Sequence, residues 1–150
     1  TGAFGYMTLE SIDEILKRTG LVNAPIEPMK KISEYPGLRV FTQRWPLSNA
    51  RSIEDFYREY EKMETHWGDV RQRAGIRGLG LKIPIPKKLE EYRKTARVLS
   101  GMRKLATIMY ESERPAEEKR IVLDSIYLSM INIARLQMGR KPIRIAKIKR

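Results

Sequence analysis

The side chains that most often carry enzyme chemistry are scarce in this sequence, which has one histidine and no cysteine. His66 stands beside Trp67 within a helical pattern, and no second histidine or cysteine is present to join it as a zinc ligand. We therefore interpret His66 as a surface or packing residue. We expect no catalytic residues, no metal site and no cofactor, and hence a chain that is not an enzyme.

Carboxylates and glycines form two further patterns that could bind a ligand. Acidic residues at positions 54, 55, 59, 61 and 64 fall on one side of an expected helix, which is typical of a solvated face. Gly75, Gly78 and Gly80 make a glycine-rich stretch. It follows no strand and lacks the Gly-Lys-Ser or Gly-Lys-Thr step of a phosphate-binding loop.

Positive charge is the strongest chemical signal, with a net charge of +12. Residues 71–104 hold 11 Lys/Arg against 2 Asp/Glu, and residues 140–150 hold 6 against 0. Such blocks favour a polyanion such as nucleic acid or an anionic membrane surface, although a solubilising surface with a disordered tail is the alternative. The candidate phosphate-contacting residues are Arg71, Arg73, Arg77, Lys82, Lys87, Lys88, Arg140, Lys141, Arg144, Lys147, Lys149 and Arg150.

These contacts are expected to be independent of base sequence, because no helix-turn-helix or RNA-binding signature accompanies them. The tail places Ile143, Ile145 and Ile148 among its basic residues. That mixture is compatible with a strand-like arm, a phosphate-binding arm, disorder or peripheral contact with an anionic membrane.

The elements that would position these residues centre on an expected helical hairpin over residues 87–139. Leu89, Tyr92, Ala96 and Leu99 recur at helical spacing and form one apolar stripe. The second helix is predicted to begin at the Arg114-Pro115 step and to stop at Gly139.

Four other segments complete the predicted organisation. Residues 1–47 are predicted to form an irregular arm with short helices, one of them from Leu9 to about Arg18. Residues 48–75 form a helical segment in which the helix is predicted to open at Ser52, because Ser52 and Asp55 can cap each other's backbone donors, and to end before Gly75. Residues 76–86 form a Gly/Pro linker, and residues 140–150 form a basic tail. The stretch from Leu38 to Phe41 is predicted to be loop. The predicted class is all-α, with elongated helices and irregular connections.

Apolar residues in excess of what one hairpin partner can cover predict further packing against the earlier helices or against another chain. The candidate partner-packing residues are Leu79, Leu81, Ile83, Ile85, Leu123, Tyr127, Met130 and Ile131. Together with Thr1 in place of a first methionine, this pattern suggests a piece of a larger protein.

Two stretches resemble the C-terminal region of the large polyvalent internal virion or DNA-ejection proteins of tailed phages. The first runs from Tyr35-Pro36-Gly37-Leu38 through Trp45-Pro46 to Ser52-Ile53-Glu54-Asp55-Phe56-Tyr57. The second is Arg114-Pro115-Ala116-Glu117-Glu118-Lys119-Arg120-Ile121, followed by Asp124-Ser125-Ile126 and Met130-Ile131-Asn132-Ile133-Ala134-Arg135. With their surroundings they cover about residues 35–139. Arg114 differs from the Ser or Asp usual before that proline.

The resemblance implies a structural protein of the virion interior that assembles near the portal and helps to deliver DNA through the host cell envelope. Its implied partners are portal, tail or other ejection proteins and further copies of itself, with DNA contacted through phosphates. The alternatives are a sequence-independent nucleic-acid-binding helical module and an accessory segment of a large virion-packaged enzyme.

Overall fold

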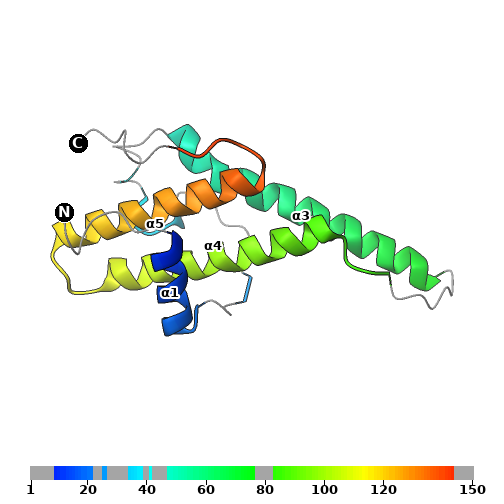
Figure 1. Ribbon diagram of the computed structural model, residues 1–150, viewed down its shortest axis with the longest axis horizontal. Helices are drawn as coiled ribbons and strands as arrows, with labels where there is room; N and C mark the ends of the chain where they lie inside the picture. The colour runs from blue at the N-terminus through cyan, green and yellow to red at the C-terminus, as the bar shows by residue number, and fades with distance from the viewer. Residues whose placement is uncertain are drawn as a thin grey trace.

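The computed structural model describes residues 9–21, 25–26, 34–38, 41, 47–76 and 83–143, and its regular structure there is helical (Figure 1). The helices are α1 (Leu9–Thr19), α3 (Leu47–Ile76), α4 (Lys87–Glu111) and α5 (Ala116–Gln137). The predicted all-α class is confirmed. No helix among the described residues is both long enough and apolar enough to cross a membrane.

Proline and glycine set the bounds of α4 and α5, which run antiparallel and side by side (Figure 1). Pro86 precedes α4 and Pro115 precedes α5, each in extended backbone conformation. At the far end of α5, Gly139 has a φ of 77° and its amide bonds the carbonyl of Leu136. The Arg140 amide bonds the carbonyl of Arg135 at 2.8 Å, which completes a Schellman turn.

Helix α3 is longer than predicted at both ends, because it begins at Leu47 and continues through Gly75 to Ile76. Ser52 is therefore not a capping residue. It is buried inside the helix, and its hydroxyl accepts a hydrogen bond from Arg135 Nη1 at 3.2 Å. Burial of Ala50 and Ile53 in the core stabilises the extra turn that local capping patterns did not predict.

Helix α5 supplies the centre of the core, and every residue from Val122 to Ile131 is buried. It packs against both α4 and α3, which together cover more of its circumference than one partner can. Leu123, Tyr127, Met130 and Ile131 therefore lie in this chain's own core. Packing against an earlier helix, the first of the two predicted alternatives, is confirmed, and the predicted role of these four residues in packing against a partner protein is not.

A short turn before α3 covers a further part of α5. The amide of Phe41 bonds the carbonyl of Gly37 at 3.2 Å, so Leu38 and Phe41 belong to a helical turn and the predicted loop is wrong there. The ring of Phe41 lies 5.6 Å from that of Tyr127. The Tyr127 hydroxyl donates a hydrogen bond to the Pro36 carbonyl. These contacts close the core over α5.

Buried tyrosines predict that the fold loses stability at high pH. Burial raises the pKa of Tyr35, Tyr57 and Tyr127, and it raises the pKa of Tyr60 and Tyr92 to about 12. Because these folded-state values exceed the ordinary value of 10.0, the stabilisation is complete below about pH 10 and is lost as the pH rises through the folded values. We expect the urea midpoint to fall steadily above about pH 10.

The measurement is urea unfolding at several pH values, with tyrosinate absorbance recorded in parallel. Tyr57→Phe removes one phenol whose pKa is raised, so the urea midpoint of that variant should depend less steeply on pH. A midpoint that stays constant up to about pH 11 would contradict the burial of these phenols.

Candidate nucleic-acid interface

The acidic residues of α3 do not form a simple solvated face, because Glu64 and Asp55 pair with arginines outside α3. Glu64 accepts hydrogen bonds from Arg93 of α4 at 2.8 Å and from the Tyr60 hydroxyl at 2.8 Å. Burial raises the pKa of Glu64, but the bonds from Arg93 and Tyr60 outweigh it and the net pKa is lowered. This ion pair joins α3 to α4.

The described residues contain no group of three His, Cys, Asp or Glu placed to hold a metal ion. His66 is exposed on α3, where it shares an open hollow with Glu61 and Asp69. A second hollow of about 540 Å³ lies near the turn between α4 and α5 and has a mostly apolar lining that includes Tyr110 and Leu123. Its Lys119 ammonium donates a hydrogen bond to the Tyr110 carbonyl. Neither hollow brings together a nucleophile and a base.

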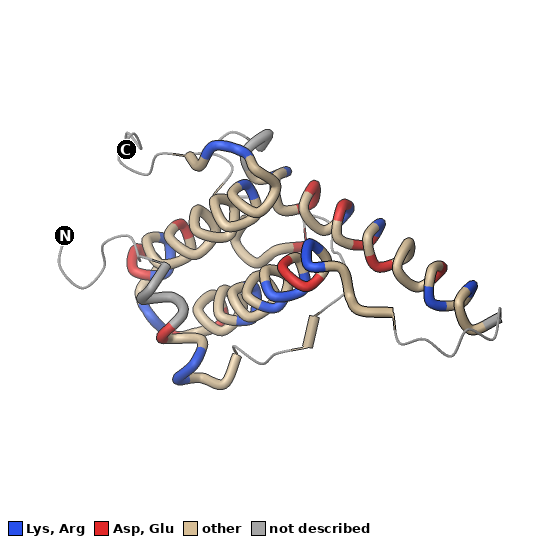
Figure 2. Tube along the Cα trace, turned by 45° about the vertical axis from the view of Figure 1, so that its right-hand side comes forward, with Lys and Arg blue, Asp and Glu red and all other residues tan. Residues whose placement is uncertain are grey.

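Basic side chains instead gather where α3 ends and α4 begins. Arg71 and Arg73 are exposed on the last turns of α3, and Lys87 and Lys88 are exposed on the first turn of α4. Both helix ends lie toward the same end of the molecule, where the last turns of α3 project past the start of α4, and we call this region the basic end (Figures 1 and 2). The predicted residues Arg77 and Lys82 lie outside the described residues, as do Leu79 and Leu81.

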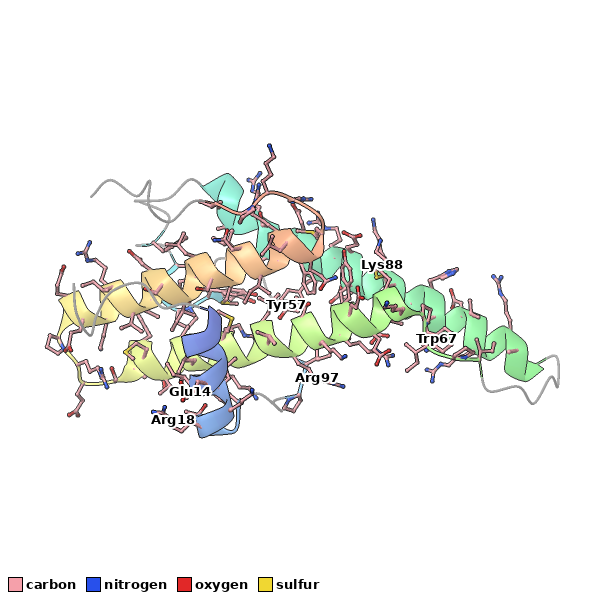
Figure 3. All side chains as sticks on the ribbon, viewed as in Figure 1. Glu14, Arg18, Tyr57, Trp67, Lys88 and Arg97 are labelled. Carbon is pink, nitrogen blue, oxygen red and sulfur yellow. The ribbon has the colours of Figure 1, made fainter. Side chains whose placement is uncertain are left out.

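Aromatic rings orient two of these cations. The Arg71 guanidinium lies 5.9 Å from the Trp67 ring, and the Lys88 ammonium lies 6.0 Å from the Tyr92 ring. Trp67 itself is buried, and Figure 3 shows it on the side of α3 that faces the segment leading into α4. Such cation–π contacts leave the charge at the surface while restricting the side chain.

The apolar residues before α4 have separate environments. Ile83 packs against the core, so the chain itself covers it. Ile85 is 43% exposed. Among the predicted partner-packing residues that the structure describes, it is the one left open to solvent.

The outer side of α4 extends the positive surface beyond the predicted residues. Lys94 and Arg97 are exposed at seven and ten positions after Lys87, which is one helix face. Glu90 and Glu91 on the same side reduce its charge without cancelling it. Sequence reasoning missed Lys94 and Arg97, although their spacing from Lys87 was visible.

Helix α1 adds two exposed cations near this face. Lys17 and Arg18 lie in its last turn, and Arg18 forms a surface pair with Glu14 at 3.7 Å. Figure 3 shows Arg18 and Arg97 on one side of α4 and Lys88 on the other. These cations therefore lie on two sides of α4.

Two other basic residues of this region face inward. Arg93 pairs with Glu64, and Arg103 is buried with its guanidinium 5.8 Å from the Tyr35 ring. Burial lowers the pKa of Arg103, and the nearby Tyr127 acts in the opposite direction. Neither residue contributes an open contact to a polyanion.

The predicted C-terminal members of the set lie elsewhere. Arg140 and Lys141 are exposed, and Arg140 pairs with Asp55 at 3.0 Å. Asp55 and Arg71 are sixteen residues apart on α3, which corresponds to about 24 Å. Arg144, Lys147, Lys149 and Arg150 lie outside the described residues. The structure thus separates the predicted residues into two places.

Comparison of the chain with protein-family models, with curated proteins and with solved structures gave no match.

Proposed function

We propose that this chain is a structural, DNA-contacting helical module of a tailed-phage ejection protein. The observation that carries the DNA contact is the exposure of Arg71, Arg73, Lys87 and Lys88 at one end of the molecule, continued by Lys94 and Arg97 along α4. Point charges on a rigid helix suit phosphate groups that repeat along a backbone. No bases need to be read.

The phage setting rests on the resemblance of residues 35–139 to ejection proteins. In that setting the module lies in the virion interior and then in the host cell envelope, with portal, tail or other ejection proteins and its own copies as partners. A sequence-independent nucleic-acid-binding module outside a phage is the second candidate, since the same basic surface favours it. Both candidates share the DNA contact, which is tested first.

Replacement of Lys87, Lys94 and Arg97 with glutamine should weaken binding to duplex DNA of any sequence. If each cation contacts one phosphate, the slope of log affinity against log salt becomes less steep by up to about 2.7. Affinity at about 0.1 M salt should fall more than tenfold. Fluorescence anisotropy of a labelled duplex across a salt series measures both quantities.

The matched control replaces Lys62, Arg114 and Lys119, which removes the same charge from other parts of the surface. This control should retain most of the affinity. Equal losses in the two triple variants would show that net charge alone acts, and failure of the unaltered chain to bind DNA at low salt would overturn the DNA contact altogether.

A further inference from the structure

The chain beyond α5 is fastened to the helices by specific side-chain hydrogen bonds. The Asn132 amide nitrogen donates to the Ile143 carbonyl at 3.0 Å, and the Asn132 carbonyl accepts from the Ile143 amide at 2.7 Å. Arg135 Nε donates to the Lys141 carbonyl at 2.6 Å. Residues 140–143 are therefore held against α5.

This fastening brings Arg140 to an α3 carboxylate that Arg58 also contacts. Asp55 Oδ2 pairs with Arg140 Nη1 at 3.0 Å, and Asp55 Oδ1 lies 3.6 Å from Arg58 Nη1. Arg135 of α5 reaches Ser52, one turn before Asp55, through its Nη1. We call Arg58, Arg135, Arg140 and Lys141 the junction cluster.

The junction cluster has more positive than negative charge. The neighbouring carboxylates are those of Glu54, Asp55 and Glu59, which lie within the same two turns of α3 as Arg58. Arg58 and Arg140 remain substantially exposed, with side chains 61% and 44% accessible. An anion can therefore approach both guanidinium groups from solvent, and planar guanidinium groups match the oxygens of a phosphate.

We infer that the junction cluster is a second phosphate-contacting site, in which Asp55 is an internal competitor for the arginines. A DNA phosphate takes over the hydrogen bonds that Arg58 and Arg140 make to Asp55. This inference rests on the proposed DNA contact and adds a second point of attachment, about 24 Å from the basic end along α3. It also adds a carboxylate that limits affinity.

Neutralising the competitor should strengthen DNA binding. Asp55→Asn removes the carboxylate charge, while the Asn132 and Arg135 bonds continue to hold residues 140–143 in place. Since an exposed ion pair contributes up to about 1 kcal/mol, we expect affinity for a labelled duplex to rise about fivefold at low salt. Circular dichroism and thermal unfolding verify that the variant is folded.

A double-mutant cycle separates a local site from a general charge effect. Arg58→Gln with Arg140→Gln should weaken binding more than Arg114→Gln with Lys119→Gln, which removes the same charge near the turn between α4 and α5. In the Arg58/Arg140 background, Asp55→Asn should give no gain. A fivefold gain that persists there would overturn the inference, as would the absence of any gain in the otherwise unaltered chain.

The two proposals fail in different ways. If the unaltered chain does not bind DNA, the proposed function fails and the inference that rests on it fails as well. If the chain binds DNA and loses affinity only on replacement of Lys87, Lys94 and Arg97, the proposed function stands and the junction cluster is not a site. Binding to anionic vesicles without binding to the duplex would overturn both assignments of the ligand as DNA.

Discussion

Phe56→Ala will lower the free energy of unfolding by about 3 to 5 kcal/mol, the usual range for a fully buried phenylalanine. The Phe56 ring is inaccessible to solvent and stacks on Tyr92 of α4 at 5.1 Å with an interplanar angle of 9°. It also stacks on Tyr60 at 6.3 Å and meets Tyr57 edge-on at 5.5 Å. Removing the ring leaves a cavity between α3 and α4 that three neighbouring aromatic rings cannot fill without moving.

Chemical denaturation of the purified chain measures this loss, and the thermal midpoint should fall by about 10 °C or more. Phe56→Leu retains much of the volume and should cost clearly less. Tyr110→Ala is the matched surface control, because Tyr110 is 51% exposed, and it should change stability by less than about 0.5 kcal/mol. Equal effects of Phe56→Ala and Tyr110→Ala would be incompatible with the packing of α3 on α4.

Gly101→Ala will destabilise the chain, although alanine is the better helix former. A Cβ at position 101 would lie 2.7 Å from the Leu21 carbonyl oxygen and 3.2 Å from Leu16 Cδ2. The first atom belongs to backbone and can move only if the end of α1 moves with it. The helix-propensity gain of up to about 1 kcal/mol is therefore outweighed by crowding, for a net loss of about 1 to 3 kcal/mol.

Gly68→Ala provides the matched control within a helix. A Cβ at position 68 of α3 meets nothing within 4 Å, so this variant should be stabilised by about 0.5 to 1 kcal/mol. Urea unfolding of both variants gives the comparison. The prediction lies in the opposite signs, and a Gly101→Ala variant as stable as Gly68→Ala would show that α1 does not approach α4 at this residue.

Local chemistry explains the parts of the fold that the sequence predicted. Pro86 and Pro115 precede helices, and Gly139 ends one, because these residues restrict or release the backbone whatever surrounds them. The predicted start of α3 was wrong because the sequence around Ser52 looks like a helix cap, whereas the helix begins at Leu47. Its true role depends on Arg135, which is eighty-three residues away.

The excess apolar surface of α5 was visible in the sequence, but the sequence did not decide whether the earlier helices or another chain cover it. Periodicity shows that Tyr127 and Ile131 need partners, whereas only the tertiary arrangement shows that α3 and the turn at Phe41 supply them. The same limit applies to the candidate site. Exposed Lys94 and Arg97 could be found from helical spacing, but the meeting of Arg58 and Arg140 at Asp55 depends on how residues 140–143 fold back.

The packing of α1 against α4 at Gly101 has a consequence for the order in which parts of the molecule unfold. Helix α1 has 11 residues and packs mainly on α4, so it is too short to persist once it leaves that surface. The middle of α5 is enclosed by three elements and can exchange its amide protons only when the whole core opens. Helix α1 is thus a separate cooperative unit of low local stability, and its release uncovers the α4 backbone at Gly101 while the three longer helices remain assembled.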